Sequence, residues 1–310
     1  MTLAHLHLLL NHVPTVGTVI ALALLVMALI RKNDGMKRLS LELFCVIGLV
    51  TIIAYVSGLG TQPQLEEMGM DIGNIQRHHD AAFQASAFML LAGFVAWLGL
   101  WQSRRGAAAR GHVPALLVLG AITIALMARA ANLGGEIRHP EILMVEGLPP
   151  ATILPVWFTA AYWGGLVNEK IWLFPAMEAV HFIALWVLFG VMIVVNARML
   201  GVLRPASFPA VHRLLPWAAL ALTTNIVTGM LFVLANPSMY LQSSPFGWKM
   251  ALLVLAGATL LYQTVFEGAW QVEAGEDSPM RVKAVAASSL ALWFGVMYFG
   301  RMLPFLGDSF

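Results

Sequence analysis

Long stretches of apolar, almost uncharged sequence are the feature that most restricts the fold of this chain. A helix that crosses a bilayer needs about 20 mostly apolar residues. Hydrophobic residues make up 59% of the chain and charged residues only 11%, whereas soluble proteins carry roughly 25% charged residues. A water-soluble domain could not bury so much apolar surface, so we predict an all-α integral membrane protein with eight transmembrane helices. The eight windows are 13–30, 41–60, 81–101, 113–133, 174–197, 215–235, 247–266 and 284–303.

A ninth charge-free stretch, 147–168, is interrupted by proline at one end and by Gly164 and Gly165 at the other. Only 156–163 is continuous, which is too short to cross a membrane. Its aromatic residues favour a helix that lies at the membrane surface. We therefore place this stretch outside the bilayer.

The basic residues indicate the orientation of the eight spans. Twelve of the 18 lie in the loops on one side, while the opposite loops hold only Arg77, Arg138 and Lys170. Cytoplasmic loops are enriched in Lys and Arg, so we predict that both termini are periplasmic. The N-terminal run lacks a basic region and a cleavage site, so we interpret it as a retained span of the bacterial inner membrane. The twelve are Arg31, Lys32, Lys37, Arg38, Arg104, Arg105, Arg110, Arg198, Arg204, Arg213, Arg281 and Lys283.

The spans divide into two groups of four. Residues 1–140 form the first four-helix module, 141–172 form an outer connector, and 173–310 form the second module. Short loops within each group favour two four-helix bundles. The two modules show no convincing residue match, which suggests a fusion of different modules.

The histidines gather on one side of this topology. Six lie at the predicted outer ends of the first four spans: His5, His7, His12, His78, His79 and His139. Imidazole is the commonest neutral metal ligand and also binds haem iron axially. Each residue alone could equally be an interfacial hydrogen-bonding group, but the cluster favours a cofactor site.

Among these histidines, His12 and His79 are the predicted axial pair, with His7 and His139 next. Spans 1 and 3 run in the same direction, so His12 and His79 enter the membrane at one level. Arg77 and Arg138 each lie within two residues of an outer histidine. They could pair with haem propionates or simply extend their head groups to the membrane surface.

The second module carries Glu178 and His181 within its fifth span. Their spacing of three residues places both on one helix face, and ionisable residues inside a membrane are functional candidates. We predict a second site here, either a haem ligand with a supporting carboxylate or a site for a quinone head group. Lys249, which opens the seventh span, could neutralise Glu178 or a bound anion. A helix-packing hydrogen bond is the alternative.

Two parts of the chain resemble families of uncharacterised bacterial inner-membrane proteins. The segments HLHLLLNHVPTVGT, HHDAA and ANLGGEIRHPEI, within about residues 3–142, resemble a four-helix family. The segments FPAMEAVHF, NARMLG, TGMLF and FGWK, within about residues 155–265, resemble a second family. The resemblance implies a redox setting like that of b-type cytochromes that work with periplasmic c-type cytochromes. It points to His7, His12, His79, His139 and His181; Gln263 stands where the second family often has histidine.

These observations favour a membrane cytochrome b-like electron-transfer subunit with haem b, one or two, near the periplasmic face. It would link the quinone pool to a periplasmic c-type cytochrome or another redox subunit, and it would contact the lipid bilayer but no nucleic acid. Whether it turns over a substrate itself stays open. One alternative is a copper- or other metal-handling protein that uses histidines, methionines and Cys45. Another is a membrane anchor subunit without a cofactor.

Overall fold

Helices form all of the regular structure in the residues that the computed structural model describes, which are 2–106, 111–138 and 155–306. Eight helical stretches among them are long and apolar enough to cross a membrane, which confirms the predicted number of apolar helices. These stretches are Leu3–Arg31, Asp34–Glu67, Ile72–Arg104, His112–Ile137, Leu173–Met199, Phe208–Ala235, Ser244–Val265 and Met280–Leu303.

Most helices extend beyond the predicted windows because polar residues continue and cap them. Asp71 accepts a hydrogen bond from the Gly73 backbone N–H at 2.8 Å and so caps the N-terminus of the third span. Asn33 caps the second span in the same way, at 3.0 Å from the Met36 N–H. The long helices are α2 (His12–Arg31), α3 (Asp34–Leu59), α5 (Ile72–Arg104), α6 (His112–Arg138), α8 (Leu173–Met199), α10 (Leu215–Ala235), α12 (Ser244–Val265) and α14 (Met280–Leu306).

The first span begins earlier than its predicted window. A short helix, α1 (Leu3–Leu10), precedes α2, and the two are separated only at Asn11. Pro14 explains the interruption, because it has no N–H and its ring conflicts with the carbonyl of Leu10, four residues earlier. His7 consequently lies on a helix that packs against α3, where the sequence placed it only before the span.

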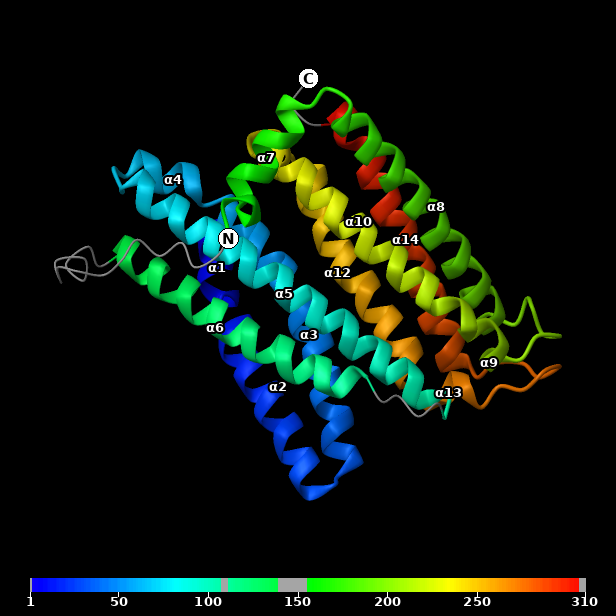
Figure 1. The fold of residues 1–310 in the computed structure, drawn as a ribbon. Coiled ribbons are helices and arrows are strands. Elements are labelled where there is room, and N and C mark those ends of the chain that lie inside the picture. The colour runs from blue at the N-terminus through cyan, green and yellow to red at the C-terminus, as the bar shows by residue number, and fades with distance from the viewer. Residues whose placement is uncertain (1, 107–110, 139–154, 307–310) are drawn as a thin grey trace. The chain divides into compact units, whose positions relative to one another are not determined.

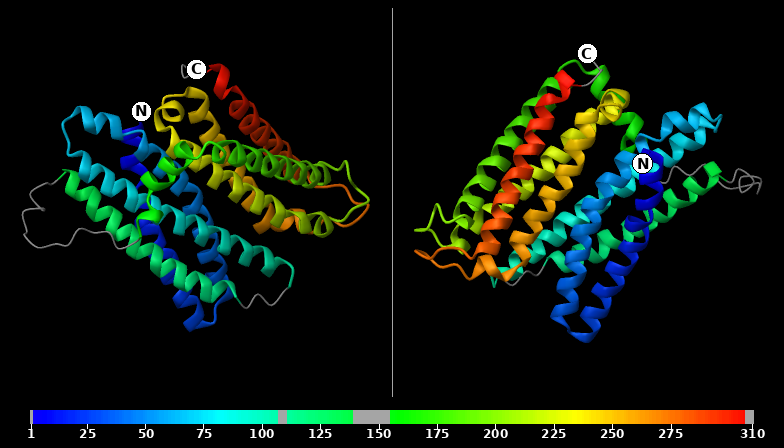
Figure 2. Two further views of the ribbon diagram at one scale, coloured as in Figure 1. Left: turned by 45° about the horizontal axis from the view of Figure 1, so that its top comes forward. Right: turned by 180° about the vertical axis from the view of Figure 1, so that it is seen from behind.

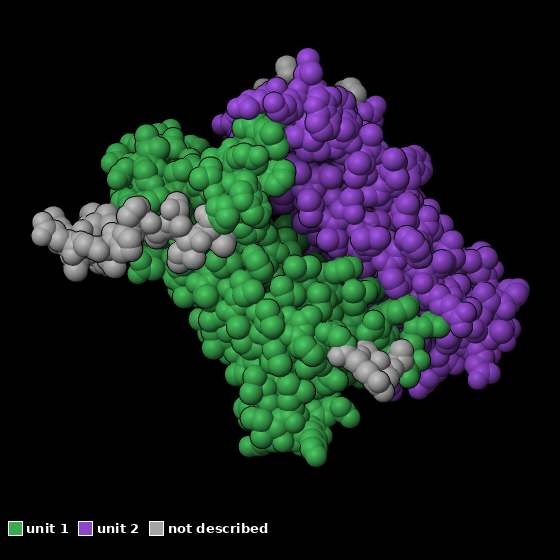
Figure 3. Space-filling view, viewed as in Figure 1, with its two compact units in different colours: residues 1–166 green, residues 167–310 purple. Residues whose placement is uncertain are grey.

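The chain divides into two compact units, Met1–Leu166 and Val167–Phe310 (Figure 3). The sequence predicted modules 1–140 and 173–310 with a separate connector, 141–172. In the structure the division instead falls within α7 (Ala160–Glu169), and the described part of the connector is shared between the units.

In unit 1, Met1–Leu166, the four long helices form a closed ring of contacts. Helix α2 packs on α3, α3 on α5, α5 on α6 and α6 on α2 (Figure 1). Small residues let α3 and α5 approach closely. A Cβ on Gly93 would lie 3.2 Å from the Phe44 carbonyl oxygen, and the Cys45 thiol donates to the Gly93 carbonyl at 3.5 Å. Such close packing by small residues is typical of membrane helices.

In unit 2, Val167–Phe310, the most extensive helix contacts run in the order α10, α8, α14 and α12 (Figure 2). Buried polar side chains connect three of these helices. The Gln263 amide of α12 donates to Asn196 Oδ1 of α8 at 2.9 Å, and Asn196 Nδ2 lies 3.4 Å from Ser289 Oγ of α14. All three side chains are fully buried, so these hydrogen bonds join helices in an otherwise apolar interior.

The segment that follows residue 154 is held against unit 1 by side chains of α5. It contains a single 3-10 turn, η2 (Val156–Phe158), and then α7. Gln84 donates to the Phe158 carbonyl oxygen at 2.7 Å. Asp80 accepts from the Ala160 backbone N–H at 3.0 Å, which satisfies a donor at the start of α7.

Large apolar side chains cover much of the outside of the long helices. Ile30 is 76% exposed, Ile183 65% and Trp186 75%. Water would disfavour these surfaces, and hydrocarbon would not. With the eight apolar helices, they indicate a membrane-embedded protein whose outer faces contact lipid.

Candidate functional site

Two histidines of unit 1 are held in the same way by the backbones of neighbouring helices. His7 Nδ1 lies 2.8 Å from the Ala54 carbonyl oxygen of α3, and His78 Nδ1 of α5 lies 2.9 Å from the Ala130 carbonyl oxygen of α6. A carbonyl oxygen only accepts, so each Nδ1 carries the proton. In a neutral imidazole this leaves Nε2 as an unprotonated ligand atom. The ring centroids are 6.5 Å apart and the ring planes are 80° apart.

A glycine makes room for each of these rings. A Cβ on Gly58 would lie 2.8 Å from His7 Cε1, and a Cβ on Gly134 would lie 3.0 Å from His78 Cε1. Each glycine follows the accepting alanine by four residues. Because the helical hydrogen bond joins the carbonyl of residue i to the N–H of residue i+4, a ring that reaches the carbonyl must pass close to residue i+4. The Ala-x-x-x-Gly spacing therefore provides both an accepting carbonyl and the space for an imidazole beside it.

His79, the neighbour of His78, has a side-chain partner instead. Its Nε2 lies 2.9 Å from the Tyr55 hydroxyl of α3. Its Nδ1 is buried and has no hydrogen-bond partner among the described residues. Since buried polar atoms are nearly always paired, this atom is a candidate for contact with a bound molecule.

The other predicted ligands of unit 1 are exposed or lie outside the described residues. His12 is the first residue of α2 and is exposed. His139 lies outside the described residues, and Arg138 ends α6 with a side chain that is not described. The pairing of His12 with His79 stays a prediction, whereas the contact that the structure does show joins His7 and His78.

Arg77 is engaged by polar residues of its own unit. Its guanidinium donates to the Asn74 side chain and lies 4.0 Å from Glu136 Oε2. Glu136 is buried and also accepts from Asn132 at 2.8 Å. The sequence did not single out Glu136 as the carboxylate near Arg77, and a propionate-binding role for Arg77 stays a prediction.

The predicted pair of unit 2 is arranged differently from the expectation. His181 Nδ1 lies 2.7 Å from Thr228 Oγ1 of α10, not against Glu178, and Glu178 is exposed. The Thr228 hydroxyl donates to the Thr224 carbonyl at 2.8 Å, so it accepts from His181 and leaves Nε2 of His181 unprotonated. The structure therefore does not show the helix-packing hydrogen bond between Glu178 and His181, because three residues of spacing set a shared face but not a shared contact. A second site at these two residues stays a prediction.

Glu178 and Lys249 have other surroundings. Burial, and secondarily the nearby Glu178 carboxylate, raises the pKa of the Tyr240 phenol above its usual value. Tyr240 belongs to the short helix α11 (Pro237–Leu241). Lys249 is partly buried and lies against Gly300, where a Cβ would be 3.5 Å from Lys249 Nζ.

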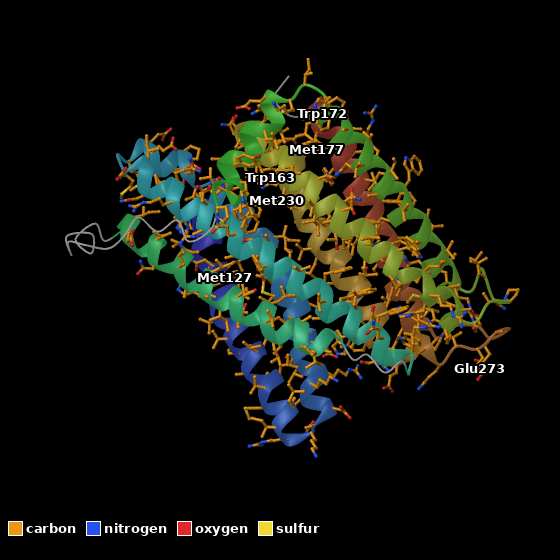
Figure 4. The ribbon with its side chains drawn as sticks, in the orientation of Figure 1. Met127, Trp163, Trp172, Met177, Met230 and Glu273 are labelled. Carbon is orange, nitrogen blue, oxygen red and sulfur yellow. The ribbon has the colours of Figure 1, made fainter. Side chains whose placement is uncertain are left out.

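Three of the sulfur atoms that a copper site could use are buried among the helices. Cys45 donates to the Gly93 carbonyl, and Met127 and Met177 are buried (Figure 4). Met177 packs with Val167 and Ala235. Within the described part of the chain, no group of three or more His, Cys, Asp or Glu side chains could hold a metal ion.

The two-histidine arrangement suits a cofactor that supplies its other ligands itself. The ring centroids of His7 and His78 lie 6.5 Å apart, and both Nε2 atoms are ligand-competent. Imidazole nitrogen is a common protein ligand of haem iron. In haem, the macrocycle provides the four remaining donors, so the residues present fit this group.

His78 belonged to the predicted histidine cluster but not to the predicted ligands, and Tyr55 and Thr228 were not among the predicted site residues. Comparison with family models, with characterised proteins and with solved structures finds no significant match to this chain.

Proposed function

We propose that the protein is a cytochrome b-like electron-transfer subunit of the bacterial inner membrane, which binds haem b in unit 1 and links the quinone pool to a periplasmic redox partner such as a c-type cytochrome. The observation that carries the proposal is the matched pair of histidines. His7 and His78 come from different helices, and each is held through Nδ1 by a main-chain carbonyl. Hydrogen bonding of the distal ring nitrogen is the usual support for a metal-binding histidine.

In this proposal His7 and His78 would hold the haem iron through Nε2. The Ala54 and Ala130 carbonyls orient the rings and fix their tautomers, and Gly58 and Gly134 leave space for them. The surrounding helices exclude water and lower the local polarity. Bound haem would supply one-electron chemistry that amino-acid side chains do not provide.

The proposed topology places both termini and the histidine pair on the periplasmic side, with each unit a four-helix bundle. It rests on the excess of basic residues in the opposite loops. We expect a phosphatase reporter fused after Phe310 to be active and a cytoplasm-dependent fluorescent reporter to be dark. The reverse pattern would contradict this orientation.

A haem in unit 2 is the second part of the proposal, with His181 as its ligand. Its Nε2 is unprotonated, as in the unit 1 pair, because Nδ1 is committed to Thr228. Replacing His181 with alanine is expected to remove only the haem that unit 2 binds. An unchanged haem-to-protein ratio in that variant would limit the protein to one haem.

The test of the main proposal is the optical spectrum of the purified protein, oxidised and reduced with dithionite, together with metal analysis. We expect a low-spin haem spectrum that is lost or shifted in His7→Ala and in His78→Ala. His5→Ala is the matched control, since His5 is exposed and bonds only within its own helix end. Loss of the spectrum in His12→Ala and His79→Ala instead would favour the other pair.

Two results would overturn the proposal. Copper or another metal without haem would point to a metal-handling protein, and neither haem nor metal in the intact protein would point to an anchor subunit.

A further inference from the structure

Tyr55 and His79 together hold one hydrogen-bond donor more than they use on each other. A neutral imidazole has one N–H and a phenol has one O–H, and a single bond of 2.9 Å joins the two side chains. If the Tyr55 hydroxyl donates, the N–H lies on Nδ1 of His79, which is buried without a partner among the described residues. If Nε2 donates instead, the Tyr55 hydroxyl is the donor left over. Either arrangement calls for an acceptor.

A row of aromatic rings begins beside Tyr55. Tyr55 and Phe83 have ring centroids 6.3 Å apart, and Phe83 and Phe158 have centroids 5.9 Å apart. Phe88 also lies against Phe158, at 6.1 Å. His79, Phe83 and Phe158 all keep part of their surface exposed, so a flat molecule could reach them from outside the helices.

The backbone at Phe158 is held in place by polar side chains. Gln84 donates to the Phe158 carbonyl and accepts from the Arg129 guanidinium at 2.9 Å. Asp80 holds the beginning of α7 two residues later. These three polar side chains lie within long apolar helices, where burying a polar or ionisable group in the membrane is unfavourable and marks a functional candidate. Here they fix an aromatic wall beside Tyr55 and His79.

We propose that Tyr55 and His79 bind the head group of a lipid-soluble quinone, with a quinone carbonyl oxygen as the missing acceptor and Phe83 and Phe158 as the wall against its ring. A quinone is neutral, flat and an acceptor, and it arrives through hydrocarbon. A charged ligand would lose its hydration in these apolar surroundings. Sites of this kind combine mostly apolar walls with a few placed polar groups.

The site adjoins the proposed haem site along both helices. Tyr55 follows Ala54, which holds His7, and His79 follows His78. The inference therefore deepens the proposed function and rests on it for its redox role, while the binding of quinone can be measured on its own. It also places the quinone in unit 1, whereas the sequence suggested the Glu178 and His181 region of unit 2.

The probe is decylubiquinone, titrated into the full-length protein in lipid nanodiscs and followed by quenching of tryptophan fluorescence. Trp157 is a local reporter, since its ring centroid lies 5.9 Å from that of Phe158. We expect saturable binding that weakens at least about fivefold in Tyr55→Phe and in His79→Gln, as loss of a hydrogen bond implies. Phe83→Leu should also weaken it. Tyr262→Phe, in unit 2, is the matched control and should bind as the parent does.

Haem content and thermal unfolding of each variant separate the possible failures. Tyr55→Phe should keep its haem spectrum, because Ala54 and not Tyr55 holds His7, while its melting temperature records the loss of the Tyr55–His79 hydrogen bond. Absence of saturable binding in the parent protein, or parent-like binding in both Tyr55→Phe and His79→Gln, would overturn the inference even if haem is present. Binding that depends on Tyr55 in a protein without haem would support the inference and reject the proposed electron-transfer function.

Discussion

The two units are both built from four long apolar helices, yet they use their buried polar groups differently. In unit 1 the notable groups are imidazoles, which turn one nitrogen to the backbone and leave the other without a proton. In unit 2 amides and hydroxyls bond to each other across helices, as Gln263 does with Asn196 and Thr259 with Ser289, and others bond to carbonyls of their own helix, as Thr223 does. His181 of that unit is held by a side chain and not by a carbonyl.

The difference suggests how to distinguish a site from a structural contact inside a membrane. Interhelical hydrogen bonds between amides and hydroxyls join helices whatever the function. Helix packing alone does not require an imidazole whose Nε2 is left unprotonated and whose ring lies against a glycine. Unit 1 has two such rings close together, and the following predictions test whether that contrast is real.

The largest effect is expected from filling the space beside the unit 1 histidines. Gly58→Ala and Gly134→Ala would place methyl groups 2.8 and 3.0 Å from the imidazoles, so the rings must move. Changes next to a metal-binding histidine typically cost about 10–100-fold in metal affinity, and we expect haem content to fall accordingly. Haem-to-protein ratios measure this.

Unit 2 supplies the controls for these glycine variants. Gly229→Ala would bring a methyl group only to 3.8 Å from His181 Cε1, and Gly190→Ala meets nothing within 4 Å. Both should retain their haem, and Gly190→Ala should not lower stability, since alanine favours helix over glycine. Equal losses of haem in all four glycine variants would show that the two units do not differ in this respect.

A medium effect is expected from the amide pair of unit 2. Asn196→Leu or Gln263→Leu leaves a buried amide without its partner, which costs about 1–3 kcal/mol of unfolding free energy. The double variant should lose less than the two single losses added together, because it removes both partners. Unfolding in mixed micelles measures each value, with the exposed Ser288→Ala as control. Strict additivity would show that the pair is not coupled.

A smaller effect is expected at Thr228. Thr228→Val keeps the shape but removes the acceptor for His181, and interhelical bonds of this kind average about 0.6 kcal/mol in a membrane. Thr228→Ser should restore stability, and the unit 1 haem should be unaffected. Thr223→Val, whose hydroxyl bonds only within its helix, is the matched control. A loss of unit 1 haem in Thr228→Val would mean that the units do not act separately.

The smallest effect concerns the loop before α14. The Lys283 ammonium, 2.7 Å from Asp277, lowers the pKa of that carboxyl below its ordinary value of 3.8. A lowered folded-state pKa stabilises the protein above about pH 4 and ceases to do so as the pH falls through the lowered pKa. Melting temperatures between about pH 5 and pH 3 should therefore fall slightly more in the parent than in Lys283→Met. Identical curves would show that the exposed pair contributes nothing.

The helices could be predicted closely, whereas only part of the candidate site could. His7 was among the predicted ligands, but its partner His78 was not, since His79 next to it suited the same argument. The two residues are about 100° apart around a helix of 3.6 residues per turn. Which of them faces α6 and which faces α3 depends on how α5 is rotated in the unit.

The sequence by itself determined the number of apolar helices, because the bilayer acts on each segment separately and length and apolarity are local properties. It also carried the Ala-x-x-x-Gly spacings at Ala54 and Ala130, but their meaning was not visible in one dimension. Only the tertiary structure decided that His7 and His78 meet, that His79 bonds Tyr55 and that His181 bonds Thr228 and not Glu178. The physical reason is that a side chain's partner depends on the rotation and separation of neighbouring helices, and small residues far apart in the chain set both.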